Sequence, residues 1–581
     1  MTDRANTVAD PNGSIERFPQ PAWWLGLLGL LLVLAGAALA FSIRTANGTS
    51  VRDIRFAGAS GETMSALLYV PPGVSAAAPA PGILAVHGYL NSRESQDGFA
   101  IEFARRGYVV LSLDQTGHGY SGGAALTNGF GGPDGLRYLR SLPMVDTRQI
   151  GLEGHSMGGW AVLAAAAAMP DAYRSIVLVG SSTGAPFAKE GSSAWPRNLA
   201  LVFSRYDEFS GFMWDTRRAI DVTLSPKLQK LFKTRDPVVA KRVYGPIASG
   251  TARVLFQPAT THPGEHISPE AIRHATDWFV VTLNGGRPRP SADQIWYWKE
   301  VGTGMGLVGF VLVLLGAFDA LVRMPAFATL QREPVPGGDL RDSRWWTWFA
   351  LNAAIPALLF LPVFIGAGLL LPPSTLLPQA VTTQVTAWAL ASAGLVLLMR
   401  RLARTPEARA QPPWLATIGI ALATVAVGYA VLWLVDQVFG TDFRLWVVAV
   451  KLPSARQWAI AALYVVPLIL AFLATLRPLC HGMTVRGDRP LVRYGAAALA
   501  LSLGFVVMLG AIYAILFATG RLVTGFDPLS TVIAIQFVPV LVAVAVVAIF
   551  TWQRTSSHRP GALIAGLLVT LYVVAGTATQ V

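Results

Sequence analysis

A serine between glycines offers residue types and a spacing suited to nucleophilic chemistry. Ser156 lies in Gly154-His155-Ser156-Met157-Gly158-Gly159, a G-x-S-x-G pattern followed by one further glycine. The pattern alone is weak, but residues 149–153 predict a buried strand before it and residues 160–169 a helix after it. In a sharp turn between a strand and a helix, the hydroxyl stands exposed at the start of the helix. We therefore predict that Ser156 is a nucleophile.

An acid is needed to support such a serine. A serine hydroxyl is a poor nucleophile at neutral pH and requires a histidine base that is oriented by a carboxylate. With this type of turn, the three groups follow one another along the chain as serine, acid and histidine. Residues 199–203 predict a strand that ends shortly before Asp207 and Glu208. We predict Asp207 as the acid, with Glu208 as the alternative.

Two histidines compete for the role of the base. His262 and His266 both lie in residues 261–268, after the last predicted strand. We favour His266 because it follows a Pro-Gly turn and directly precedes the closing helix, which is predicted to start near Ser268. His262 is the alternative base, and the histidine that is not the base is expected to be structural.

The negative charge that develops on a substrate carbonyl requires two backbone N–H donors. The first expected donor is the N–H of Met157, the residue after the nucleophile. The second is expected in the loop after the predicted strand 83–87, where we assign the N–H of Tyr89. Gly88 would allow the backbone to approach the substrate closely.

The elements that must position these residues alternate between strand and helix. Residues 54–57 and 65–70 predict an antiparallel entry, and residues 94–106 and 131–141 predict helices. Strands are predicted at 83–87, 108–114, 175–179, 199–203 and 254–257. This alternation predicts a mainly parallel sheet with helices on both faces.

Taken together, residues 50–285 resemble α/β-hydrolases of the dienelactone-hydrolase or serine-esterase type. The resemblance is carried by Val86-His87-Gly88, residues 114–121 (DQTGHGYS), the turn around Ser156, Asp207 and residues 261–268. It implies the α/β-hydrolase fold and a serine hydrolase of esters, thioesters or peptides that works without a cofactor. It specifies the reaction class and not the substrate.

A basic insertion precedes the last predicted strand. Residues 209–250 interleave lysines and arginines with apolar residues such as Leu228, Leu231 and Phe232. The resemblance implies that an insertion here acts as a lid that shapes the pocket. Its amphipathic pattern fits equally a lid that touches anionic lipid headgroups and a solvated helical face.

Composition places the rest of the chain in a membrane. Of 581 residues, 53% are hydrophobic and only 14% are charged, which is not typical of a soluble protein. The net charge of +13 does not indicate nucleic acid, because the arginines beyond residue 300 fall in loops between apolar segments. The single cysteine, Cys480, excludes an intrachain disulfide and a cysteine metal site. We predict no nucleic-acid partner, no cofactor and no metal.

Nine apolar segments predict membrane spans. Residues 1–22 predict a cytoplasmic tail and 23–41 an anchor, although Ala38-Leu39-Ala40 also resembles a signal-peptide cleavage site. Residues 42–298 predict the hydrolase domain, and residues 299–581 an all-α transmembrane helix bundle. Its eight spans are expected at 302–322, 346–371, 379–399, 414–435, 458–476, 494–518, 531–552 and 562–577.

The distribution of positive charge predicts the orientation. Beyond residue 300, 14 of 18 lysines and arginines follow the first, third, fifth or seventh of these eight spans. Because short cytoplasmic loops are enriched in lysine and arginine, these loops are expected to be cytoplasmic. The hydrolase domain is then extracytoplasmic and the N-terminus is cytoplasmic.

The sequence therefore predicts a multi-pass membrane serine hydrolase that cleaves an ester or a related acyl bond, with lipids among the candidate substrates. A serine peptidase or an acyltransferase would use the same residues. A transporter or membrane scaffold with a regulatory hydrolase-like domain is the alternative of another class. Ionisable residues such as Asp319 and Asp436 are scarce within the spans, which disfavours an ion-coupled transporter.

Overall fold

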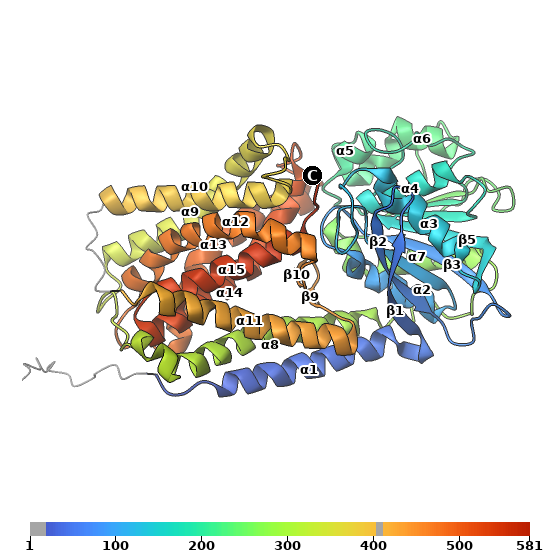
Figure 1. Cartoon of the computed structure of the whole chain (residues 1–581). Helices are drawn as coiled ribbons and strands as arrows, with labels where there is room; N and C mark the ends of the chain where they lie inside the picture. Colours follow the sequence, from blue (N-terminus) through green and yellow to red (C-terminus); the bar gives the residue numbers. More distant parts are fainter. Residues whose placement is uncertain (1–18, 403–410) are drawn as a thin grey trace, which may run out of the picture.

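The computed structural model describes residues 19–402 and 411–581, which form an α/β domain beside a bundle of long helices (Figure 1). The predicted cytoplasmic tail therefore lies largely outside the described residues. Arg404 and Arg409, which contribute to the charge asymmetry of the loops, also lie outside them.

An eight-stranded sheet forms the centre of the α/β domain, in the order β1-β2-β4-β3-β5-β6-β7-β8. Antiparallel pairs join β1 to β2 and β2 to β4, and all other neighbours in this sheet are parallel. This confirms the predicted antiparallel entry and mainly parallel sheet. The strands are β1 (Ser50–Ala57), β2 (Thr63–Val70), β3 (Ala80–Val86), β4 (Val109–Leu113), β5 (Val145–His155), β6 (Ser175–Val179), β7 (Leu199–Val202) and β8 (Arg253–Phe256).

Helices cover both faces of this sheet. Successive strand residues point to opposite faces, so Leu84 of β3 packs in one core and Ile83 in the other. The first face is covered by α3 (Gly132–Ser141) and α4 (Met157–Ala168). The second is covered by α2 (Asp97–Arg105) and α7 (Pro269–Thr282). Ser268 caps α7 by accepting the Ala271 N–H at 3.2 Å, as its sequence predicted.

The insertion between β7 and β8 contains α5 (Ser210–Trp214), η4 (Ala219–Leu224) and α6 (Pro226–Phe232). The apolar side chains Leu228, Leu231 and Phe232 are buried in the core of the α/β domain. The apolar face of α6 thus packs onto the core of the α/β domain instead of facing a membrane.

Nine helices of the described ranges are long and apolar enough to cross a membrane. They comprise 18 to 30 residues, and at about 1.5 Å per residue such helices match a hydrocarbon core of about 30 Å. They are α1 (Trp24–Arg44), α8 (Trp296–Val322), α9 (Ser343–Leu370), α10 (Ala380–Leu402), α11 (Trp414–Phe439), α12 (Ala455–Gly482), α13 (Pro490–Thr519), α14 (Pro528–Thr555) and α15 (Arg559–Gly576).

Helix α1 packs closely along α8. A Cβ atom added at Gly29 would lie 2.6 Å from the Gly309 carbonyl oxygen, and one added at Gly302 would lie 2.5 Å from that of Gly36. Such pairs of glycines let two membrane helices approach each other. The segment Ala38-Leu39-Ala40 lies within α1, and Ala40 is fully buried.

The loops of the bundle divide between its two ends. At the end beside the α/β domain lie the hairpin of β9 (Phe443–Leu445) and β10 (Val448–Val450) and the chain after α15 (Figure 1). At the other end, the segment after α8 contacts the α12–α13 loop, where Gly337 N–H donates to Thr484 O at 2.8 Å. The described arginines that follow α8 and α12 therefore lie at the end of the bundle away from the α/β domain.

Candidate active site

Ser156 occupies a strained turn between β5 and α4. Its φ of 54° and ψ of −120° lie outside the regions that non-glycine residues ordinarily adopt, which costs about 1–3 kcal/mol. Glycines on both sides make the turn possible: a Cβ at Gly154 would collide with the Gly158 carbonyl, and one at Gly158 with the Val86 carbonyl. Strain held at one residue by tight packing is typical of a functional site.

The predicted acid lies beside one of the two candidate bases. Asp207 follows β7 and His262 follows β8, and His262 Nδ1 lies 2.8 Å from Asp207 Oδ2 with both side chains buried. Burial by itself lowers the pKa of His262, but the negative charges of Asp207 and Glu208 outweigh it and raise the pKa above its usual value. The carboxylate thus favours the protonated imidazole, as a general base requires.

His266 occupies a different environment. Its ring stacks against that of His155 with 3.9 Å between centroids, and its Nδ1 has no hydrogen-bond partner. Burial and the neighbouring His262 lower the pKa of His266 to about 3. The structure therefore brings His262 to Asp207 and leaves our favoured His266 without a carboxylate partner, because residues 263–267 form a 3₁₀ turn that directs the two histidines differently.

Two further buried carboxyl groups hold the loop of His262. Glu208 accepts the His262 backbone N–H at 2.7 Å through Oε2 and the Tyr513 hydroxyl of α13 at 2.7 Å through Oε1. Burial and the charge of Asp207 raise the pKa of Glu208 to about 7. Glu265 accepts from the N–H and the hydroxyl of Ser204, and burial raises the pKa of Glu265. Glu208 thus supports the backbone of His262, whereas Asp207 contacts its ring.

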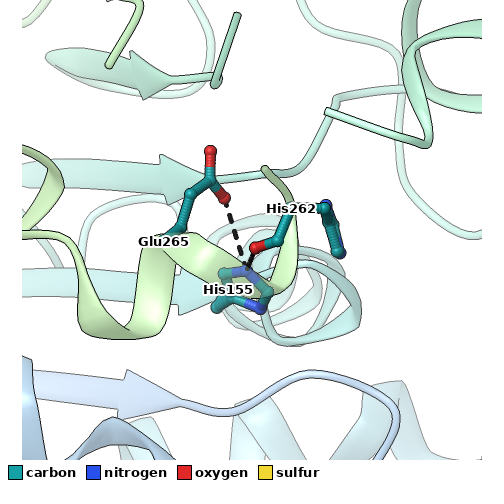
Figure 2. Close-up of side chains that lie close together, drawn as sticks. All are labelled: His155, His262 and Glu265. Carbon is teal, nitrogen blue, oxygen red and sulfur yellow. Dashed lines mark hydrogen bonds and ion pairs between the residues drawn. The ribbon is translucent and has the colours of Figure 1, made fainter. Parts of the chain in front are cut away.

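His155, His262 and Glu265 lie close enough together to suggest a metal site (Figure 2). His155 Nε2 lies 3.0 Å from the His262 carbonyl oxygen and 3.3 Å from Glu265 Oε2. However, Nδ1 of His262 is engaged by Asp207, and the His262 ring lies beside that of His155 with 4.7 Å between centroids. The raised pKa of Glu265 also disfavours the carboxylate form that a cation prefers. These three residues are therefore better explained as contacts that hold the loop of His262 in place than as ligands of a metal ion.

The loop after β3 carries the predicted second oxyanion donor. A Cβ added at Gly88 would lie 3.4 Å from Ser156 Cβ, so this backbone passes directly beside the serine. The Tyr89 carbonyl lies 2.7 Å from His118 Nε2. From the helical domain, Gln580 donates to the Tyr89 hydroxyl at 2.9 Å, and Gly576 O accepts the Asn91 N–H at 2.9 Å. The loop that holds Tyr89 is therefore fixed from both domains.

Ser156 and His262 line one pocket of about 80 Å³ together with the Tyr89 loop and Phe209. The wall opposite the hydrolase residues comes from the helical domain, as Glu300, Arg444, Trp446, Val447, Leu529 and Val532. Sequence reasoning missed this wall. The signal that could have indicated this wall is a polar stretch with Arg444 and Lys451, which lies between two predicted spans on the side predicted for the hydrolase domain.

The two acidic neighbours are expected to differ in kinetic importance. Asp207→Asn should lower kcat about ten-thousandfold, because the amide no longer holds the imidazole in the correct tautomer. Glu208→Gln retains an acceptor for the His262 N–H and a donor toward Tyr513, so we expect turnover within about tenfold of the wild type. Steady-state hydrolysis of a soluble ester measures both. A larger loss in Glu208→Gln would transfer the role of the acid to Glu208.

Comparison with known proteins defines the class of the first domain. Residues 81–214, from β3 to α5, match the family described as alpha/beta hydrolase fold. Together with the sheet order, this shows that the chain contains an α/β-hydrolase domain, which is fused to a domain of apolar helices that can span a membrane.

Individual relatives cover parts of the chain. The monoacylglycerol lipase of Mycolicibacterium smegmatis is 28% identical over 220 residues, which are 35% of this chain and 72% of the lipase. A protein named as a non-heme haloperoxidase from Mycobacterium phage D29 is 31% identical over 113 residues, 19% of this chain and 40% of the phage protein. The chain thus spans less than half the length of the phage relative. Among solved structures, the Pyrococcus furiosus esterase Pf2001 is 18% identical over 40% of this chain and 93% of the esterase, with a TM-score of 0.29. The family match and the lipase relative support a hydrolase.

Proposed function

We propose that this protein is a multi-pass membrane serine hydrolase that cleaves a carboxylic ester through an acyl-Ser156 intermediate. The observation that carries the proposal is the Asp207–His262 pair, in which His262 lines the same pocket as the strained Ser156. The relative named monoacylglycerol lipase favours an ester over a peptide as the substrate.

In the proposed reaction, Ser156 Oγ attacks the ester carbonyl while His262 Nε2 accepts the proton of the Ser156 hydroxyl. The N–H groups of Met157 and Tyr89 stabilise the oxyanion. His262 then passes the proton to the departing alcohol, which leaves the acyl group on Ser156. Water gives a proton to His262 as it attacks the acyl-enzyme, and the carboxylic acid is released when Ser156 regains its proton. Asp207 orients the imidazole throughout.

The test uses the full chain in membranes. A fluorophosphonate probe should label the protein, and mass spectrometry should place the adduct on the peptide that contains Ser156. A panel of esters and peptides should show turnover of esters. Peptide cleavage without ester cleavage would identify a peptidase, acyl transfer to an added alcohol without hydrolysis would identify an acyltransferase, and neither labelling nor turnover would favour a regulatory domain.

The proposal includes an uncleaved anchor and an extracytoplasmic hydrolase domain. The close glycine contacts between α1 and α8 support retention of α1. The described arginines that follow α8 and α12 lie at the end of the bundle away from the hydrolase domain, and arginines in short loops are typical of the cytoplasmic side.

Protease accessibility tests this orientation. Protease added to spheroplasts should cut exposed loops of the hydrolase domain, such as residues 233–250, while the membrane is intact. Gel mobility and N-terminal sequencing should show that residues 23–41 are retained. Cleavage of the hydrolase domain only after the membrane is opened would contradict the orientation, and a mature N-terminus after Ala40 would contradict the anchor.

A further inference from the structure

The β9–β10 hairpin separates the catalytic pocket from a second cavity. Arg444, Trp446 and Val447 line the pocket that contains Ser156. Leu445, Val448 and Val450 line a cavity within the helical domain. One short hairpin therefore forms a wall of both spaces, and Figure 1 shows it between the helical bundle and the α/β domain.

The second cavity is apolar and lies among membrane helices. It has a volume of about 300 Å³ and is lined by residues of α8, α11, α14 and α15 in addition to the hairpin. None of its lining residues is charged, and aliphatic side chains such as Leu307, Val540 and Val569 predominate. Val308 and Leu445, which also line it, are 58% and 53% exposed, so the cavity reaches the outer surface of the bundle. In a membrane this surface faces lipid.

The sizes of the two spaces indicate how a substrate is divided between them. Pockets for small molecules are typically about 300–1,000 Å³. The catalytic pocket, at about 80 Å³, holds little more than the reacting group, whereas the cavity behind the hairpin reaches the lower end of that range. An apolar cavity of about 150 Å³ already binds benzene, so this one suits an apolar chain better than water.

The hairpin is anchored through β9, where the buried Arg444 donates to Ser95 at 3.2 Å and lies 3.5 Å from Glu94, and its turn contacts the catalytic loop. Trp446 Nε1 donates to the Pro263 carbonyl at 2.8 Å, one residue after His262, and the Trp446 N–H donates to Glu300 at 3.2 Å. Trp446 has a φ of 53°, which is unfavourable for a bulky residue. Each strand of the hairpin has only three residues. Arg444 thus fixes β9, and the passage of a substrate past the hairpin requires movement only at the turn of Trp446 and Val447, which line the catalytic pocket.

We propose that the cavity binds the acyl chain of a single-chain lipid ester that enters from the bilayer, and that the ester group reaches Ser156 past the β9–β10 hairpin. This inference rests on the proposed esterase function and names its substrate class. A single chain is specified because the cavity volume lies at the lower end of the range for ligand sites. The helical domain thus selects the substrate, and the α/β domain cleaves it.

Two neighbouring residues of α14 provide a matched test. Ala543 lines the cavity, whereas Val542 is 36% exposed and lines neither space. In the full chain, Ala543→Phe should lower kcat/KM for a palmitoyl ester about a hundredfold and leave a butyryl ester within about twofold. Val542→Phe should change neither. If the ratio of kcat/KM for the two esters is unchanged in Ala543→Phe, the inference is overturned, whereas the proposed ester hydrolysis is not.

Crosslinking provides a test that does not depend on the variants. A long-chain alkyl fluorophosphonate with a diazirine near the end of its chain reacts at Ser156 and is then irradiated in the wild-type protein. Crosslinks should fall on 539–547 or 565–572. Crosslinks confined to the α/β domain would overturn the cavity assignment. No labelling of Ser156 together with no turnover of any ester would overturn the proposed function and this inference with it.

Discussion

Ser156→Ala is expected to lower kcat for ester hydrolysis about a millionfold and to abolish labelling by a fluorophosphonate, because loss of the nucleophile removes the covalent route. The residual rate should come only from substrate binding and from stabilisation of the oxyanion by the N–H groups of Met157 and Tyr89. Alanine keeps the same backbone conformation, so the unfolding temperature should change little. Single-turnover kinetics on the full chain in detergent measures this loss.

The matched control is Ser141→Ala, an exposed serine at the end of α3. It should retain wild-type turnover and labelling. Near-normal turnover in Ser156→Ala, after contaminating esterases have been excluded with a mock purification, would contradict the assignment of the nucleophile.

His262→Ala is expected to lower kcat by a similar factor of about a million, since a triad histidine acts as a unit with its serine. His266→Ala should keep turnover within about tenfold of the wild type, because His266 lines the pocket and stacks on His155 but does not contact Asp207. Comparison of the two variants at saturating substrate measures the difference. The reverse pattern would restore His266 as the base.

The pH profile of the wild type provides a further check on His262. A general base must be neutral, so kcat/KM should rise with pH through the pKa of the base in the free enzyme. Since Asp207 and Glu208 raise the pKa of His262 above 6.5, the midpoint of this rise should lie above pH 6.5. Because the pKa of Glu208 is itself raised to about 7, this group carries only part of a charge near the midpoint, and Glu208→Gln should shift the midpoint only slightly to lower pH. A midpoint near pH 3 would instead point to His266.

Elements with strong local patterns were predictable from the sequence. The run 175–179 is β6, and each of the eight predicted spans corresponds to one of the helices α8 to α15. A strand that is buried on both faces of a parallel sheet and a helix that is buried in lipid each consist of an uninterrupted run of apolar residues. Such elements can therefore be predicted from the local sequence. The start of helix α8 could not be predicted from the local sequence. The helix begins at Trp296, six residues before the predicted span, because Lys299 is buried 3.0 Å from Asp97.

The candidate site was predictable only in part. The glycines around Ser156 and the strand before Asp207 are local signals, and they are the basis for predicting Ser156 as the nucleophile and Asp207 as the acid, which stay predictions. The choice between His262 and His266 depends on how one turn packs against β5 and β7, which four residues of spacing do not encode. The pocket wall from Trp446 and its neighbours depends on contacts across hundreds of residues, and no local pattern reports them.

The contacts of the chain after α15 with the Tyr89 loop bear on how the protein is made. Gly576 accepts the Asn91 N–H, and Gln580 donates to Tyr89. Ribosomes produce these residues after every membrane helix described, long after the hydrolase domain has emerged. The loop of Tyr89, the predicted oxyanion donor, therefore lacks these two contacts until α15 and the residues after it have been made. Under the proposed function, ester cleavage is therefore expected to begin only after α15 has been made.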